Sequence, residues 1–554
     1  MRLNKKSIIL PILAILLTAS CGGGSDGVSS IEGDKNPFGK YQELTTIEMV
    51  RTSDSTIDST ILAHYPDETL IDNRFSQLYL DKLNLKVNYK FIAADAEDYQ
   101  NKINLAMTSG QLPEFMIVDT DTAKKLYEAE VLKPLDDMWA DYASPYLKSI
   151  TGQDELAACS FGGNLYGIPQ MYSTIDRAQF CFVRLDWIKK LNEKDSSLNL
   201  KENPQTIDEL EAIARAFIDK DPDGNGKKDT QGILFQGDIW ADMGGFTGIF
   251  NAYESYPNIW VENQQGNLEF GSVQQTTKNA LTKLSQWYQD GIISREFVSQ
   301  SSSTIASTLT QGKAGIFFCE QWGCQYPLQD VYNLDDSADW VALPLMTATS
   351  NRAKTQASMG TYGWWVATNN CSRPEAVIKM MNVYLDSIWG ENGDFEKYYM
   401  PSDTGASIWK LSPVTPEPPT KNLDAYLEIK KAMNEQSTTS LKGEAKQIYQ
   451  QIQSYLDGKD SLWSWSKGYN PENKCVYETM NYYVENELIK YDEYVGAPTD
   501  TMSDKYTLIQ KEQNKVFVNI ITGAASVDTF DTFVETFGKL GGTQITNEVN
   551  AARK

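Results

Sequence analysis

The feature most clearly missing from this sequence is histidine. His64 is the single histidine among 554 residues, which excludes zinc sites built on several histidines and leaves histidine-based acid–base chemistry to one residue. Neither an HExxH metalloprotease motif nor a P-loop is present. Basic residues are also scarce, with 50 against 74 acidic residues and a formal net charge of -24. Such a charge repels phosphate backbones and argues against nucleic-acid binding.

Cysteine is infrequent too, with seven in the chain. Cys21 lies near the N-terminus, and the other six are Cys159, Cys181, Cys319, Cys324, Cys371 and Cys475. An even number permits disulfides outside the cytosol, and Cys319 and Cys324 are near enough in sequence to close a small loop. No CxxC pair occurs, so a thioredoxin-like or zinc-ribbon site has no support. For most of these cysteines we favour the role of buried small apolar residues.

No apolar run near the N-terminus is long enough for a normal membrane span. Ile8–Leu17 is apolar and follows a short basic stretch, as in the hydrophobic region of a signal peptide. Small residues then lead to Cys21, an arrangement that resembles a bacterial lipobox, although Thr18 stands where leucine is usual. In a lipobox the cysteine sulfur carries diacylglycerol. Plain secretion with an incidental cysteine is the alternative.

These features predict a lipoprotein signal peptide over residues 1–20 and a flexible tether over residues 21–40. The tether begins with a glycine- and serine-rich stretch, which favours a mobile chain. We therefore expect lipid at Cys21, with palmitate as a typical added acyl group, and a protein held at the outer face of the cell membrane.

The rest of the chain is long enough for several domains. Strand-like and helical patterns alternate along it, which favours an α/β protein. A capping box, Thr206 with Glu209, predicts the start of one helix, and Pro374 predicts the start of another. The expected strands are 46–50, 85–92, 115–118, 314–318, 340–343 and 362–368, with a helix over 97–108 and a mostly helical C-terminal third.

Several short motifs together resemble extracellular solute-binding protein family 1, the lipoprotein receptors of bacterial ABC importers. Each motif is weak alone, but they follow the order of the family behind the lipobox. The matching segments are 112–115 (LPEF), 163–169 (GNLYGIP), 204–210 (PQTIDEL), 311–317 (QGKAGIF), 374–376 (PEA), Phe530, 541–542 (GG) and 547–550 (NEVN). The last of these resemble the tail of the longer, oligosaccharide-type members.

The resemblance implies a two-lobed, periplasmic-binding-protein-like (type II) α/β fold with a hinge and a helical C-terminal region. The first lobe would hold residues 41–170 and 341–395, and the second 171–340 and 396–554. A monomer of this family captures a carbohydrate by closing its lobes and presents it to an ABC transporter permease, without covalent chemistry. The sequence is therefore predicted to be no enzyme.

The segment DPDGNGKKD begins at Asp221 and fits the first half of a calcium-loop pattern. The expected ligands are side-chain oxygens and one backbone carbonyl, from Asp221, Asp223, Asn225, Lys227 (carbonyl) and Asp229. Gly232 stands at position twelve, where a bidentate glutamate is usual, so water or a distant residue would complete the shell. A surface turn without metal is the alternative to a structural calcium site.

Aromatic side chains suggest the ligand contacts, because sugar rings present apolar C–H faces and hydroxyl edges. Trp322 follows a predicted strand where maltose-type receptors place a stacking tryptophan. Trp364 and Trp365 alternate along another strand, so at most one should face the ligand. The full candidate set is Trp322, Trp364, Trp365, Trp240, Trp260, Asp119 and Asp121. Core packing is the alternative for each tryptophan, and helix capping or a solvated surface for each aspartate.

Two other functions stay open at this point. A secreted, acidic, tryptophan-rich chain could be a glycoside hydrolase, which needs two carboxylates at a suitable separation, and 74 acidic residues neither identify nor exclude such a pair. The same fold could also serve a tethered sensor that binds a sugar and reports it to a membrane receptor. The family resemblance favours the transport receptor over both.

Overall fold

The computed structural model describes residues 35–53, 57, 61–357, 361–402 and 404–553. Residues 36–554 form one compact unit. The predicted signal peptide, Cys21 and the tether up to residue 34 lie outside the described residues. Among the helices that are described, none combines the length and apolarity that a membrane crossing requires.

The first lobe is built on the N-terminal strands. β1 (Thr45–Thr52) pairs in parallel with β2 (Leu85–Ala93), and β13 (Thr361–Ala367) pairs antiparallel with both β3 (Phe115–Val118) and β6 (Ile168–Met171). Apolar side chains from these strands form two core clusters with the surrounding helices. The helices are α1 (Leu62–His64), α2 (Arg74–Leu83), α3 (Ala96–Ser109), α4 (Thr120–Glu128), α5 (Asp136–Tyr142), α6 (Pro145–Ile150), α7 (Gln153–Ala158), α14 (Ala376–Trp389) and α15 (Phe395–Tyr398).

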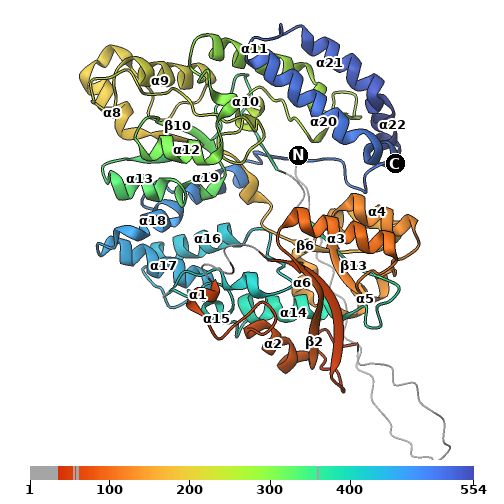
Figure 1. The fold of residues 1–554 in the computed structure, drawn as a ribbon. Coiled ribbons are helices and arrows are strands. Elements are labelled where there is room, and N and C mark those ends of the chain that lie inside the picture. The colour runs from red at the N-terminus through yellow and green to blue at the C-terminus, as the bar shows by residue number, and fades with distance from the viewer. Residues whose placement is uncertain (1–34, 54–56, 58–60, 358–360, 403, 554) are drawn as a thin grey trace, which may run out of the picture. The chain divides into compact units, whose positions relative to one another are not determined.

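The second lobe has a sheet of its own, in which β7 (Phe180–Arg184) lies between β10 (Ile316–Cys319) and β11 (Trp340–Leu343). Every residue of these strands is buried, as expected for strands covered on both faces. The C-terminal helix α20 (Asp500–Ile521) lies beside α11 (Gln275–Gln289) (Figure 1). The other helices here are α8 (Leu185–Lys194), α9 (Ile207–Asp219), α10 (Thr247–Ala252), α12 (Ser302–Thr310), α13 (Leu328–Leu334), α16 (Lys421–Asn434), α17 (Gly443–Leu456), α18 (Trp463–Tyr469), α19 (Val476–Glu485), α21 (Thr529–Phe537) and α22 (Thr543–Ala552).

Short strand pairs complete the sheet structure. The described pairs are β4 (Ser160–Phe161) with β5 (Asn164–Leu165), β8 (Trp260–Glu262) with β9 (Leu268–Phe270), and β12 (Thr355–Ala357) with β14 (Ile489–Tyr491).

Local sequence signals place these elements well. The strands expected over 115–118 and 340–343 have those bounds in the structure. Thr206 caps α9 and forms the expected capping box with Glu209. Helix α14 begins at Ala376, two residues after Pro374. The capping interactions are local, so the sequence alone carries them.

The lobe boundaries need two corrections. β11 pairs with β7, so residues 341–343 lie in the second sheet and not, as expected, in the first lobe. Residues 396–414 were expected in the second lobe, but Tyr399, Ile408 and Leu411 are buried in the core cluster of the first. Sheet partners and core contacts are long-range, so local pattern does not give them.

Two described segments, 172–179 and 412–420, connect elements of the two sheets or cores. Residues 344–354 stay with the second lobe, because Leu345, Met346 and Ala353 are buried in its core. These two crossings are joined by a hydrogen bond of 3.0 Å from the hydroxyl of Ser173 to the carbonyl of Pro419. Asn422 of α16 donates to Asp176 over 2.6 Å, and Lys421 of α16 pairs with Glu444 of α17 over 3.1 Å. The Asn422 contact thus fixes α16 to the first crossing, and the Lys421 pair holds α16 against α17.

Candidate functional site

Two cavities meet at Asp119, where β3 ends and α4 begins. We call the first, of about 420 Å³, the first-lobe pocket, and the second, of about 610 Å³, the bridging pocket. Both volumes fall within the range typical of small-molecule sites. Asp119 lines both, and its carboxylate caps α4 by accepting a hydrogen bond from the backbone of Thr122 over 2.7 Å.

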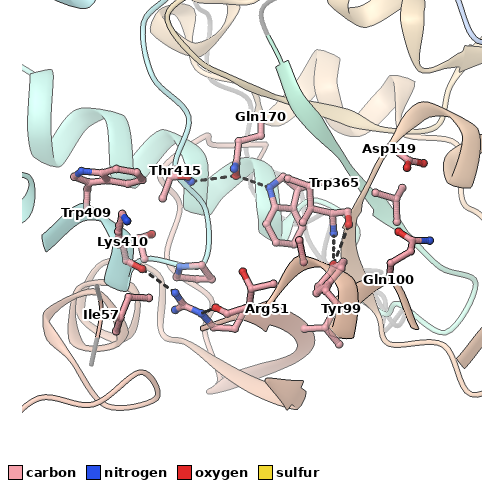
Figure 2. Close-up of a pocket in the computed structure, with 17 residues that line it drawn as sticks. Arg51, Ile57, Tyr99, Gln100, Asp119, Gln170, Trp365, Trp409, Lys410 and Thr415 are labelled. Carbon is pink, nitrogen blue, oxygen red and sulfur yellow. Dashed lines mark hydrogen bonds between the residues drawn. The ribbon is translucent and has the colours of Figure 1, made fainter. Parts of the chain in front are cut away.

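The first-lobe pocket is formed by the ends of β1 and β3, the start of α3 and the segment around Trp409 (Figure 2). Gln170 on β6 accepts hydrogen bonds from the indole of Trp365 (2.8 Å) and from the backbone of Thr415 (3.2 Å). Tyr99 fixes α3 to β3 through a hydrogen bond of 2.9 Å to the carbonyl of Ile117. The walls of this pocket are therefore held rigidly by the surrounding chain.

The charged groups of the first-lobe pocket are bound to its own walls. Arg51 is 9% exposed, and its guanidinium donates to the carbonyls of Thr52 (3.2 Å), Leu411 (3.0 Å) and Lys410 (2.7 Å). It also lies over the ring of Tyr89. The ammonium of Lys410 lies 5.8 Å from the ring centre of Trp409. Arg51 thus serves to fasten the 410–411 segment to β1.

The bridging pocket takes its walls from both lobes. From the first lobe come residues 119–121, Ala158, Thr361 and Trp364, and from the crossing segment comes Tyr172. From the second lobe come Trp260, Asp492, Tyr494, Met502, Ser503 and Tyr506. A ligand in this cavity touches both lobes at once, which is the geometry that couples binding to closure.

Segment 491–499 forms much of the second-lobe wall, and the sequence reasoning missed it. The carboxylate of Asp492 accepts hydrogen bonds from the backbones of Trp260 (3.1 Å) and Tyr494 (3.0 Å). At the far end of the segment, Lys124 of α4 donates to the carbonyl of Pro498 over 3.0 Å and pairs with Asp500. An acidic and aromatic run ending in glycine and proline was the signal that could have indicated this wall.

Two polar atoms of the bridging pocket have no hydrogen-bond partner among the described residues. They are Oδ1 of Asp121 and Oγ of Ser503, and both atoms are buried. The other oxygen of Asp121 pairs with Lys125 over 2.5 Å. Burial raises the pKa of Asp492 to about 6, with a smaller contribution from Glu493. Buried polar atoms without partners are costly, so the pocket wall has two positions whose hydrogen-bonding capacity is unused.

A charged cluster adjoins the bridging pocket through Tyr172. The guanidinium of Arg177 lies 5.5 Å from the ring centre of Tyr172 and contacts Glu320 and Asp242, each over 3.3 Å. Glu320 also accepts a hydrogen bond of 3.1 Å from the indole of Trp322. Burial is the main reason that the pKa of Glu320 rises to about 7, although Arg177 opposes the shift.

The predicted ligand residues separate into three groups. The bridging pocket brings together Trp260, Trp364, Asp119 and Asp121. The first-lobe pocket contains Trp365 and shares Asp119. Trp364 and Trp365 point to opposite faces of β13, as expected. Each face borders a different pocket, so Trp364 lines the bridging pocket and Trp365 lines the first-lobe pocket.

The remaining two tryptophans line neither pocket. Trp240 donates from its indole to Asn514 of α20 over 2.7 Å and packs against Phe250 and Phe517. Trp322 is half-buried beside the second-lobe core and reaches the bridging pocket only through Glu320 and Arg177. The location of both tryptophans is set by tertiary packing, which the sequence pattern alone does not reveal.

The predicted calcium loop follows α9 as expected. The amide of Asn225 donates to Asp223 (2.7 Å) and Asp229 (3.0 Å), so these side chains converge. Oδ1 of Asp221 is buried without a partner among the described residues, and its other oxygen accepts from the backbone of Gly226. The pKa of Asp223 is raised, mainly by burial and then by Asp221. Across the described chain, no group of three or more His, Cys, Asp and Glu side chains is arranged as a metal centre.

Gly232 and the cysteines are structural. A side chain at Gly232 would meet the carbonyl of Ile292 at 2.9 Å, so position twelve of the loop is part of the core.

All six described cysteines are free and buried, and Cys319 and Cys324 therefore form no loop disulfide. Burial raises the pKa of the Cys324 thiol to about 12, which leaves it protonated and unreactive at neutral pH.

Comparison with known proteins agrees with this geometry. The family model of bacterial extracellular solute-binding proteins matches residues 68–388. Lipoprotein LipO of Bacillus subtilis (strain 168) is 27% identical over 325 residues, which are 57% of this chain and 56% of that protein. The polygalacturonan/rhamnogalacturonan-binding protein YtcQ of the same organism is 25% identical over 301 residues, 53% of this chain and 56% of its own length. The chain thus spans a little over half the length of these relatives.

Among solved structures, the alginate-binding protein AlgQ2, determined without calcium ion, has a TM-score of 0.57 at 16% identity. The match covers 92% of this chain and 98% of that one. It establishes the two-lobed periplasmic-binding-protein fold for nearly the whole chain.

Proposed function

The chain belongs to the bacterial extracellular solute-binding proteins, and from this we propose that it captures an oligosaccharide between its lobes and delivers it to an ABC transporter permease. The bridging pocket carries the proposal, because aromatic rings and unpaired oxygen atoms line it from both lobes. The relative YtcQ is named for carbohydrate binding, which supports the same ligand class. Binding proteins of this kind need no catalytic residues, and the proposal assigns none.

Within the pocket, each group has a simple role. Tyr494 and Tyr506 are half-buried and offer flat faces to sugar rings, while Asp119, Asp121 and Ser503 meet the hydroxyl edges. Tyr172, held by Arg177, forms the base between the lobes. Trp322 lines neither pocket, and its indole donates to Glu320.

We also propose that the protein is a lipoprotein. Its signal peptide, residues 1–20, and the lipobox at Cys21 support a diacylglycerol anchor on the outer face of the cell membrane. The relative LipO is itself named a lipoprotein. A tether from residue 21 to about 40 would let the binding lobes reach ligand above the membrane.

A structural calcium ion is a further part of the proposal. The residues fit such an ion, because Asp221 has an unpaired oxygen and the Asn225 amide lies between two carboxylates. The ion would be held by Asp221, Asp223, Asn225, Asp229 and the carbonyl of Lys227, with oxygen ligands of the type that Ca²⁺ prefers. Its role would be to neutralise the converging carboxylates and fix the turn after α9.

For the lobes themselves we propose revised limits. The first lobe comprises residues 41–171 together with 361–414, and the second comprises residues 180–357 and the helical region from 421 onward. These limits follow the sheet pairing of β11 and the core contacts of residues 396–414.

The proposed function predicts that the protein binds an oligosaccharide without cleaving it. Thermal melts against a panel of oligosaccharides should reveal a ligand-dependent shift, and chromatography should recover the sugar intact. Tyr494→Ala should weaken binding by about 1–2 kcal/mol, or about five- to thirtyfold, through the lost aromatic contact. Tyr491→Ala is the matched control, because Tyr491 is exposed and does not line the pocket. Cleavage of the sugar by the pure protein would instead identify a hydrolase.

A further inference from the structure

We propose that this binding site selects uncharged oligosaccharides and rejects chains of uronic acids, because the charged residues that line the bridging pocket are all carboxylates and the nearest arginine and lysine side chains are bound to the protein. The inference rests on the proposed function and adds the chemical class of the ligand. It concerns the bridging pocket, which shares Asp119 with the first-lobe pocket.

The bridging pocket presents negative charge. Asp119, Asp121 and Asp492 line it, and none of the described lining residues is lysine or arginine. Asp121 has one oxygen paired with Lys125 and the other buried without a described partner. Burial raises the pKa of Asp492 to about 6, so it is still mostly ionised at neutral pH. The carboxylate of a uronate that enters this cavity would meet repulsion in a partly desolvated space.

The nearby cations are already engaged. Arg51 gives three hydrogen bonds to backbone carbonyls. Arg177 contacts Glu320 and Asp242. Lys124 holds Asp500 and the carbonyl of Pro498. A uronate would have to displace these contacts to gain a counter-ion, and the wall segments that they fasten would be released.

A neutral sugar suits the same groups without this conflict. A hydroxyl group both donates and accepts a hydrogen bond, so it can donate to the carboxylates of Asp119, Asp121 and Asp492 that line the cavity. A carboxylate only accepts, so it can form no hydrogen bond with these three groups. The aromatic faces of Tyr494 and Tyr506 can bind the rings of neutral and uronic sugars alike. The polar groups of the pocket therefore determine which of the two classes binds more tightly.

The test uses pairs of oligosaccharides that differ only in charge. Uronate oligomers of several linkages are compared with their carboxyl-reduced counterparts, alongside common neutral oligosaccharides, by calorimetry at pH 7.5 at constant ionic strength. We expect the tightest ligand to be neutral and its uronate counterpart to bind at least about tenfold more weakly. A uronate that binds as tightly as its reduced partner, or more tightly, overturns the inference.

Substitutions in the bridging pocket then test whether its carboxylates cause the preference for neutral sugars over uronates. Asp492→Asn and Asp121→Asn should each reduce the neutral-to-uronate affinity ratio at least about threefold, while Asp195→Asn, at a partly exposed carboxylate of the second lobe that lines neither pocket, should leave it unchanged. An unchanged ratio in both pocket variants also overturns the inference, and thermal melts establish that the variants are folded. If no oligosaccharide of either class binds, the proposed function itself fails, which is a different result from uronate binding.

Discussion

The buried carboxyl group of Glu320 should make the free energy of unfolding fall as the pH rises toward 7. The carboxyl group lies at the end of β10, is 7% exposed, and contacts Arg177 and Trp322. Burial is the largest cause of its raised pKa, which moves from 4.5 to about 7. The folded protein therefore favours the protonated form more strongly than the unfolded chain does.

The sign and size of the effect follow from linkage. A raised pKa in the folded state contributes stability below about pH 4.5, and this stability is lost as the pH rises toward 7. The rise of this pKa from 4.5 to about 7 corresponds to about 3 kcal/mol in the free energy of unfolding. Glutamine has nearly the shape of protonated glutamate and stays neutral. Glu320→Gln should therefore gain about 3 kcal/mol relative to the parent between about pH 4.5 and pH 7.5.

Urea unfolding followed by tryptophan fluorescence at several pH values measures this difference. Asp242→Asn is the matched control, because Asp242 contacts the same guanidinium but its side chain is 53% exposed; it should keep most of the pH slope of the parent. If the curves for Glu320→Gln and the parent stay parallel within about 0.5 kcal/mol, burial does not hold Glu320 in its protonated form and the reasoning is wrong.

Two further predictions concern the anchor and the metal loop. Cys21→Ser should move the protein from the membrane fraction to the medium, because the acylated sulfur is the proposed anchor; a variant that stays in the membrane would contradict the lipobox. Removal of calcium by a chelator should lower the melting temperature, since an ion at 100 times its Kd stabilises the folded state by about 2.7 kcal/mol. Asp229→Asn should abolish this response while Asp195→Asn retains it, and a melt insensitive to chelator in the parent, with no bound metal by mass spectrometry, would refute the site.

Local sequence patterns determined a large part of this structure. The capping box of Thr206 and Glu209 indicated α9, and the short apolar run over 115–118 indicated β3. Such signals involve side chains and backbone within a few residues of each other, so no tertiary information is needed. The ordered motifs also indicated the family and, through it, the two-lobed fold.

Tertiary structure decided how the site is put together. Trp260 and Trp364 are 104 positions apart in sequence, and only the packing of the lobes places them in one cavity. Asp492 and Tyr494 join that cavity because β14 pairs with β12, a long-range contact with no local signature. By the same packing, Trp240 is fixed against α20 and Trp322 against the second-lobe core.

The sequence by itself therefore determined the secondary elements, the family and the residue types suited to a sugar. Only the tertiary structure decided which aromatic and acidic side chains share a cavity, and which charged groups are already paired. The physical reason is range: capping and periodicity act over one or two turns of chain, whereas burial and ion pairing join residues such as Arg177 and Glu320, which are 143 positions apart.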